Sequence, residues 1–211
     1  MKKQYELIIF DLDGTLLDTS EGIFNSVRYA EKCMGFEPIS DVRLREFVGP
    51  PPKSMYMQVY GANEEDAVLA TQKHREYGKT KAIYEAKVYS GMEKTLQILK
   101  SQGYKLAVAT LKSQKIAEVV LENFKLAKYF DVIIGMNESE NLTKCMTIQM
   151  AIEQTQTTGW TLMVGDSQYD YDGAKEAEVD FVGALYGFGF DGSYEGRFAT
   201  IKNPSELLLI V

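Results

Sequence analysis

Residues 7 to 16 read Leu7-Ile8-Ile9-Phe10-Asp11-Leu12-Asp13-Gly14-Thr15-Leu16, and this stretch decides the fold. Its first four residues are apolar, which is typical of a short strand that is covered on both faces of a parallel sheet. The strand then ends at two carboxylates. Ligands bind at the carboxyl ends of the strands in an open α/β sheet, so Asp11 and Asp13 lie where chemistry is expected. Their spacing of two residues points both side chains to the same face if the strand continues.

The segment that follows, residues 19 to 84, carries helical patterns and no convincing strand. We expect a capping box at Asp18–Glu21 to open its first helix. Gly78 is expected to kink or break a long helix over residues 64–85, and His74 on the polar face of that helix is expected to be exposed. A block of helices that interrupts an α/β pattern most simply forms an inserted domain.

From residue 92 onward, helical patterns alternate with strand patterns. Strands are expected over residues 105–109, 131–134, 160–164 and 181–183, and a last helix over residues 205–210. We therefore predict an α/β protein with a Rossmann-like parallel sheet core of residues 1–16 and 86–211. An all-helical cap domain of residues 17–85 is inserted into this core.

The composition is that of an ordinary globular protein, with 211 residues, 45% hydrophobic and 25% charged. A net charge of -7 disfavours an unaided nucleic-acid surface and an anionic membrane. The basic amino terminus does not resemble a secretory signal, and no apolar run has the length of a membrane span, so we expect a cytoplasmic protein. Cys33 and Cys145 are far apart, which predicts two buried free thiols rather than a disulfide.

Polar side chains follow three of the expected strands, and a lysine begins a helix after another strand. These residues are Asp11 with Asp13, Thr110, Lys144, and Asp166 with Asp170. The carboxyl ends of parallel strands meet at one edge, so we expect these groups to gather there. Massed carboxylates need a cation, and oxygen ligands suit Mg²⁺ better than zinc. With the backbone amides after the first strand, they form an anion site the size of a phosphate.

In their order along the chain, these residues resemble the four motifs of the haloacid dehalogenase-like hydrolase superfamily. The matching segments are Asp11-x-Asp13-Gly14-Thr15, Thr110, Lys144 and Gly165-Asp166-Ser167-x-x-Asp170. The resemblance covers nearly the whole chain. The helical insert, together with residues 45–51 and 164–174, is similar to the small-cap, phosphoglycolate phosphatase-like group of this superfamily.

The resemblance implies a Mg²⁺-dependent phosphatase that hydrolyses a small phosphomonoester. Asp11 would be the nucleophile that forms an aspartyl-phosphate, which divides one difficult hydrolysis into two easier steps. Asp13 would be the general acid and base. Thr110 and Lys144 would hold the phosphoryl oxygens. The lysine is assigned from its position, because Cys145 follows it where many relatives have a proline.

The resemblance also implies a ligand set for the metal. Asp11, the backbone carbonyl of Asp13, and Asp166 would hold Mg²⁺. Asp170 would orient a metal-bound water or Lys144 rather than bind the metal directly.

Three further basic residues are candidates for substrate contact, although each is more often an ordinary surface charge. They are Arg45, Lys53 and Lys112. The expected partner is a small-molecule phosphomonoester, with no nucleic acid and no membrane, and the chain is expected to be a monomer or a homodimer.

Several functions share parts of this pattern. Phosphoglycolate is the substrate that the group resemblance indicates, and nucleoside monophosphates, sugar phosphates and a sugar-phosphate mutase stay open. A haloacid dehalogenase does not need Asp13 or Asp166. A phosphonate hydrolase needs a cap lysine, but the setting of Lys53 matches the phosphatase group better. A non-catalytic phosphate-sensing module is the alternative from another class, and it gains nothing from two acids beside a phosphate.

Overall fold

The computed structural model describes residues 4–139, 141–190, 193 and 198–211. The chain divides into two compact units, one of Met1–Asp18 with Val88–Val211 and one of Thr19–Lys87. The sequence pattern placed these boundaries at residues 16/17 and 85/86.

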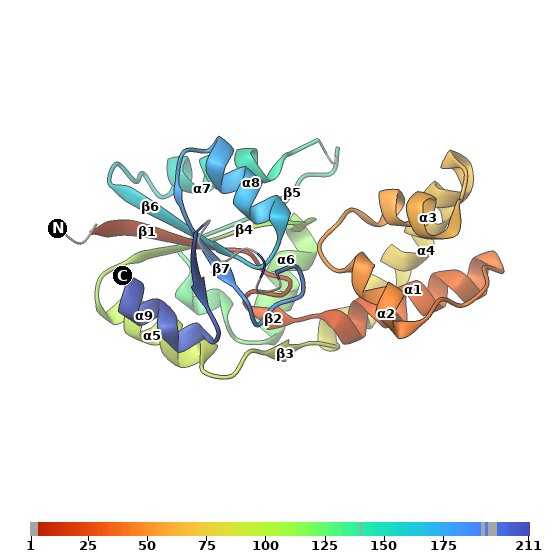
Figure 1. The fold of residues 1–211 in the computed structure, drawn as a ribbon, viewed down its shortest axis with the longest axis horizontal. Coiled ribbons are helices and arrows are strands. Elements are labelled where there is room, and N and C mark those ends of the chain that lie inside the picture. The colour runs from red at the N-terminus through yellow and green to blue at the C-terminus, as the bar shows by residue number, and fades with distance from the viewer. Residues whose placement is uncertain (1–3, 140, 191–192, 194–197) are drawn as a thin grey trace. The chain divides into compact units, whose positions relative to one another are not determined.

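The larger unit is built on a six-stranded sheet in the order β5-β4-β1-β6-β7-β8, with every pairing parallel. Its strands are β1 Tyr5–Phe10, β4 Lys105–Ser113, β5 Val132–Met136, β6 Trp160–Gly165, β7 Asp180–Ala184 and β8 Ala199–Ile201. Its helices are α5 Met92–Ser101, α6 Gln114–Asn123, α7 Lys144–Gln154, α8 Gln168–Glu176 and α9 Leu207–Ile210, with short 3-10 turns η3 Ala127–Tyr129 and η5 Pro204–Glu206. In Figure 1, α7 and α8 lie on one face of the sheet, and α5 and α9 lie on the other. The predicted α/β class is confirmed.

Strand β1 lies inside the sheet because its four apolar residues need cover on both faces. It pairs with β4 on one side and β6 on the other, and Phe10 is level with Val108 and Val164. Leu7 to Phe10 are fully buried. Strands β1 and β6 therefore end almost level with each other, and the residue after β1, Asp11, lies at the carboxyl edge of the sheet beside β4.

Two expectations about this unit are corrected. Strand β4 continues past residue 109 to Ser113, with an irregularity in its pairing with β5 between Ala109 and Ser113. The expected last helix over residues 205–210 is a 3-10 turn, η5, followed by the single turn of α9. Three short strands were not expected: β8 at the sheet edge, and β2 Leu17–Asp18 with β3 Lys87–Val88, which form a two-stranded sheet.

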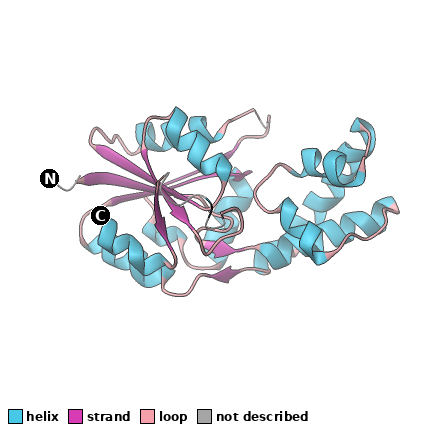
Figure 2. Ribbon diagram, viewed as in Figure 1, coloured by secondary structure: helices cyan, strands magenta, loops and turns pink. Residues whose placement is uncertain are grey.

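The smaller unit is helical, and no strand occurs in residues 19–84, all of which the structure describes. Figure 2 shows these helices in cyan. They are α1 Ser20–Met34, α2 Asp41–Leu44, α3 Pro52–Tyr60 and α4 Glu64–Thr80, with the 3-10 turns η1 Arg45–Phe47 and η2 Ala82–Tyr84. Their core gathers Val27, Leu44, Phe47 and the fully buried Tyr56.

Four local expectations in the smaller unit are wrong. The N-cap of α1 is Thr19 rather than Asp18, the first residue of the predicted capping box, and the side chain of Thr19 makes no capping hydrogen bond. Helix α4 continues through Gly78 to Thr80, so the expected break does not occur there. His74 is half-buried, and its Nδ1 lies 3.3 Å from the hydroxyl of Tyr56. Cys33 is exposed, whereas Cys145 is buried as predicted, and both are free thiols.

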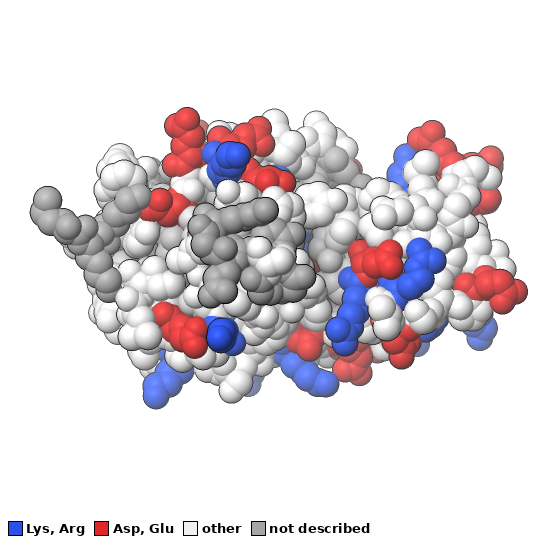
Figure 3. All heavy atoms as spheres, in the orientation of Figure 1, with Lys and Arg blue, Asp and Glu red and all other residues white. Residues whose placement is uncertain are grey.

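Among the described residues, no helix is both long and apolar enough to cross a membrane. On the face drawn in Figure 3, acidic and basic side chains are interspersed rather than gathered by sign.

Candidate active site

Asp11 occupies the first position beyond β1, and the sheet holds its backbone. Its N–H donates to the carbonyl of Val164 over 2.9 Å. Its side chain is buried, and Oδ1 accepts a hydrogen bond of 2.6 Å from the ammonium of Lys144. Burial raises the pKa of Asp11 to about 7, although Lys144 works to lower it. The site therefore holds a carboxylate in a dry environment beside a fixed cation.

Lys144 is the first residue of α7, where the hydroxyl of Thr143 caps the helix by accepting from the N–H of Met146. Its buried ammonium lies between two carboxylates, 2.6 Å from Asp11 Oδ1 and 2.6 Å from Asp170 Oδ1. Burial works to lower the pKa of Lys144, but these two carboxylates raise it above its ordinary value. Gly173 of α8 leaves room for this side chain, because a Cβ there would lie 2.6 Å from Lys144 Cγ. Lys144 is thus a buried group of the site and not a surface charge.

Asp166 follows β6 and is fixed from two sides. Its Oδ1 accepts from the Thr15 hydroxyl over 3.1 Å, and its Oδ2 accepts from the N–H of Phe188 over 2.8 Å. Burial, together with the charges of Asp170 and Asp11, raises its pKa well above the ordinary value. A group that must stay charged here needs a cation close to it.

Asp170 lies in the first turn of α8 and has two roles. Its Oδ2 accepts from both the N–H and the hydroxyl of Ser167, at 3.0 and 2.7 Å, in a reciprocal capping arrangement. Its Oδ1 contacts Lys144. The carboxylate is therefore a helix cap that also holds the lysine in place.

The carboxylates at this edge fit a hard cation. One oxygen each of Asp11, Asp166 and Asp170 lie within 4.8 Å of one another. Two glycines keep space around Asp166, because a Cβ at Gly14 or Gly187 would overlap its side chain. Buried oxygen ligands without sulfur or imidazole are the donor set that Mg²⁺ prefers.

Asp13 and Thr110 lie at the same edge, and Lys112 joins them. Lys112 Nζ contacts both oxygens of Asp13, at 3.0 and 2.8 Å, and its own N–H donates to the Thr110 hydroxyl over 3.3 Å. Thr110 is buried, and the side chain of Lys112 is only 19% exposed. The interpretation of Lys112 as an ordinary surface charge is therefore wrong.

Arg45 and Lys53 belong to the helical unit. Arg45 is exposed, and Lys53 pairs with Glu64 at 2.8 Å on the surface. Their contact with substrate stays a prediction.

The segment after β7 contributes groups that sequence reasoning did not assign. Besides the N–H of Phe188 on Asp166, the hydroxyl of Tyr186 donates to the carbonyl of Thr15 over 3.1 Å. A Cβ at Gly187 would lie 2.5 Å from the Gly14 carbonyl oxygen. The alternating glycines of Gly187-Phe188-Gly189 were the only signal, because they mark backbone that approaches another group closely.

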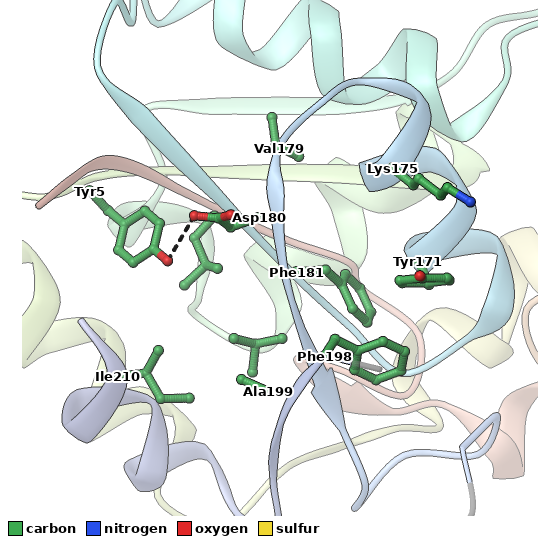
Figure 4. Close-up of a pocket in the computed structure, with 11 residues that line it drawn as sticks. Tyr5, Tyr171, Lys175, Val179, Asp180, Phe181, Phe198, Ala199 and Ile210 are labelled. Carbon is green, nitrogen blue, oxygen red and sulfur yellow. Dashed lines mark hydrogen bonds between the residues drawn. The ribbon is translucent and has the colours of Figure 1, made fainter. Parts of the chain in front are cut away.

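A pocket of about 450 Å³ lies near the amino ends of β1 and β7, and none of these carboxylates lines it (Figure 4). Tyr171, Phe181 and Phe198 form its aromatic side. The hydroxyl of Tyr5 donates to Asp180 over 3.0 Å, and burial followed by this carboxylate raises the pKa of Tyr5 to about 12. Tyr5 and Asp180 are therefore hydrogen-bonded to each other, and this pair gives no indication of a reactive group in the pocket.

The larger unit thus combines a Rossmann-like core with a buried aspartate, a buried lysine and two further buried carboxylates at the carboxyl edge of its sheet. The model for the haloacid dehalogenase-like hydrolase family matches residues 8–184, and the chain belongs to this family.

Two curated relatives and one solved structure illustrate the similarity. A 5'-nucleotidase of Pseudomonas aeruginosa is 33% identical over 188 residues, which is 88% of this chain and 85% of the relative. A phosphoglycolate phosphatase of Aquifex aeolicus is 28% identical over 97% of this chain and 96% of its own. The crystal structure of a predicted phosphatase from Clostridium acetobutylicum has a TM-score of 0.89 and 37% identity, and the match covers 98% of this chain and 99% of that one.

Proposed function

We propose that this protein is a Mg²⁺-dependent phosphatase that hydrolyses a small phosphomonoester through an aspartyl-phosphate on Asp11. The observation that carries the proposal is the 2.6 Å contact between buried Asp11 and buried Lys144, with Asp166 beside them. A carboxylate can attack an anionic phosphate only where positive charge offsets the repulsion, and this edge of the sheet gathers the groups to do so.

Asp11, Asp166 and the backbone carbonyl of Asp13 would hold the metal. When bound, Mg²⁺ supplies charge neutralisation for the nucleophile and the phosphate. Asp170 is assigned to the positioning of Lys144, because one of its oxygens contacts that ammonium and the other caps α8.

The chain's own groups then divide the reaction. An oxygen of Asp11 attacks phosphorus as the bond to the leaving oxygen breaks, and Asp13 gives that oxygen its proton. Asp13 next takes a proton from the water that attacks the acyl phosphate, which frees Asp11 and inorganic phosphate. Thr110 and Lys144 hold the phosphoryl oxygens through both steps.

The substrate is a small phosphomonoester, with phosphoglycolate as the first candidate and a nucleoside monophosphate as the second. The group resemblance and the phosphoglycolate phosphatase of Aquifex aeolicus support the first candidate, and the 5'-nucleotidase supports the second. Fold does not fix the substrate, so a phosphate-release screen over phosphoglycolate, nucleoside monophosphates and sugar phosphates decides between them. Isomerisation of a sugar phosphate without release of phosphate would identify a mutase instead.

We expect purified protein to hydrolyse 4-nitrophenyl phosphate only when Mg²⁺ is present. Chelation should lower turnover by about 100-fold or more, because the metal supplies several kcal/mol of charge stabilisation, and added Mg²⁺ should restore it. Turnover that persists in chelator would contradict the proposed dependence on Mg²⁺. An absence of turnover both with and without Mg²⁺ would contradict the proposed phosphatase activity.

Substitution of the two acids separates the metal ligand from the proton donor. Asp166→Ala should weaken Mn²⁺ binding by about tenfold or more, because it removes a ligand side chain. Asp13→Ala should leave that binding within about twofold, because its proposed metal contact is through the backbone, yet it should lower turnover by about 10² to 10⁴-fold. Titration of free Mn²⁺ by electron paramagnetic resonance measures the affinities without turnover. Equal losses of Mn²⁺ affinity in both variants would contradict the assignment.

A further inference from the structure

The pair of Lys112 with Asp13 is not explained by the roles above. Lys112 Nζ lies 2.8 and 3.0 Å from the two oxygens of Asp13, and the two side chains are only 19% and 12% exposed. In an exposed ion pair, water competes for both charged groups, so the pair contributes little to stability. In a mostly buried pair, loss of the partner leaves an uncompensated charge, so the two groups stay together.

The structure fixes the segment that carries Lys112 on both sides. Ahead of it, Thr110 accepts the N–H of Lys112. Behind it, the side chain of Gln114 donates to the carbonyl of Ile133 over 2.9 Å and accepts the N–H of Gly135 at 2.5 Å. These bonds tie the end of β4 and the start of α6 to β5, so the lysine extends from a rigid base.

Within the described part of the chain, the remaining contacts that hold the segment of Asp13 are backbone contacts. Asp13 forms an isolated bridge with Leu17, and the N–H of Gly14 donates to the Leu17 carbonyl over 2.8 Å. These contacts set where the Cα of Asp13 lies but not how its carboxyl group is turned. Lys112 contacts both carboxyl oxygens and so sets that orientation.

We propose that Lys112 is a positioning residue for the general acid Asp13. The inference rests on the proposed phosphatase function and adds that the end of β4 carries two tasks, phosphoryl binding at Thr110 and orientation of the proton donor through Lys112.

The chemistry makes this role measurable. As the Asp11–phosphorus bond forms, the bond to the leaving oxygen breaks, and the proton of Asp13 passes to that oxygen. A weakly basic leaving group departs without the proton, whereas a strongly basic one needs it. Loss of the orientation of Asp13 must therefore slow substrates with basic leaving groups most.

The test is a series of substituted phenyl phosphates that differ in the basicity of the leaving phenol, measured as kcat/KM. For Lys112→Met we expect a loss of no more than about threefold with 4-nitrophenyl phosphate and of about tenfold or more with unsubstituted phenyl phosphate, because general acid catalysis contributes roughly 10² to 10⁴-fold. The dependence of log kcat/KM on leaving-group pKa thus becomes steeper. Lys112→Arg should restore much of the shallower dependence, because a guanidinium donates to both oxygens of a carboxylate.

Lys115→Met is the matched control, because Lys115 lies three residues further on and pairs with Glu138 at 84% and 91% side-chain exposure. It removes the same charge and should leave the series unchanged. A uniform loss across the series with a raised KM would make Lys112 a substrate-binding residue and overturn the inference, as would an unchanged series in a folded Lys112→Met protein. If the wild-type protein showed no turnover, or if its turnover did not depend on Asp11, the proposed phosphatase function would be wrong. The inference about Lys112 would then be wrong as well.

Discussion

Asp11→Asn should abolish turnover, with a fall in kcat/KM of at least about 10⁴-fold, the scale on which loss of a covalent nucleophile acts. An amide oxygen carries no full negative charge and cannot form the acyl phosphate that the mechanism requires. The substitution keeps the shape of the side chain, and its carbonyl oxygen can still accept from Lys144, which now contacts Asp11 at 2.6 Å. Turnover of 4-nitrophenyl phosphate in saturating Mg²⁺ measures the effect.

The variant should stay folded, because burial of a neutral amide costs less free energy than burial of a carboxylate. Burial raises the pKa of Asp11 to about 7, which shows that the fold does not favour its charged form. Asp172→Asn on the exposed surface of α8 is the matched control and should keep wild-type turnover. A fall of kcat/KM to about one per cent of the wild-type value corresponds to about 2.7 kcal/mol in the activation free energy. If Asp11→Asn retained more activity than this, covalent catalysis at Asp11 would be ruled out.

Much of the fold was predictable because it follows from local patterns. The apolar run Leu7 to Phe10 is buried on both faces, as its lack of alternation indicates, and the block of residues 19–84 is helical. The end of β4 was not predictable. Leu111 to Ser113 show no apolar pattern and are strand only because Ser113 pairs with Met136 beyond an irregularity, a contact between distant segments.

The site likewise contains residues that were predictable from the sequence and residues that were not. Asp11, Lys144, Asp166 and Asp170 were identifiable because each side chain stands at the end of a strand or the start of a helix, where position along the chain gives position in space. Phe188 acts on Asp166 through its backbone N–H, which no pattern of residue types reveals.

Lys144→Met should cost about 3 to 5 kcal/mol in the free energy of unfolding when metal is absent, because it leaves buried carboxylates without their cation. Lys144 now lies 2.6 Å from both Asp11 and Asp170, with 5% of its side chain exposed. Methionine fills most of the volume, so the loss reports charge rather than packing. Urea denaturation in chelator measures it, and Lys115→Met, which removes an exposed charge, should change stability by no more than about 1 kcal/mol.

The deficit of Lys144→Met should depend on pH and on metal. Lys144 lowers the pKa of Asp11 against burial, so its loss raises that pKa further. The folded variant then binds a proton that the unfolded chain has released, so its stability falls as pH rises, and the deficit grows as the pH rises above about 7, where Asp11 of the wild-type protein titrates.

Bound Mg²⁺ adds positive charge at the same carboxylates, so saturating metal should reduce the stability deficit of Lys144→Met. Turnover of this variant should stay about 10² to 10³-fold below the wild-type value, because a hydrogen-bond donor to the phosphoryl group is missing. Exposed ion pairs contribute no more than about 1 kcal/mol. If Lys144→Met lost less than that in the free energy of unfolding above about pH 7 without metal, Asp11 and Asp170 would not depend on Lys144 for their charge. The ion pairs would then not be the source of the positive charge that the proposed mechanism needs beside the nucleophile.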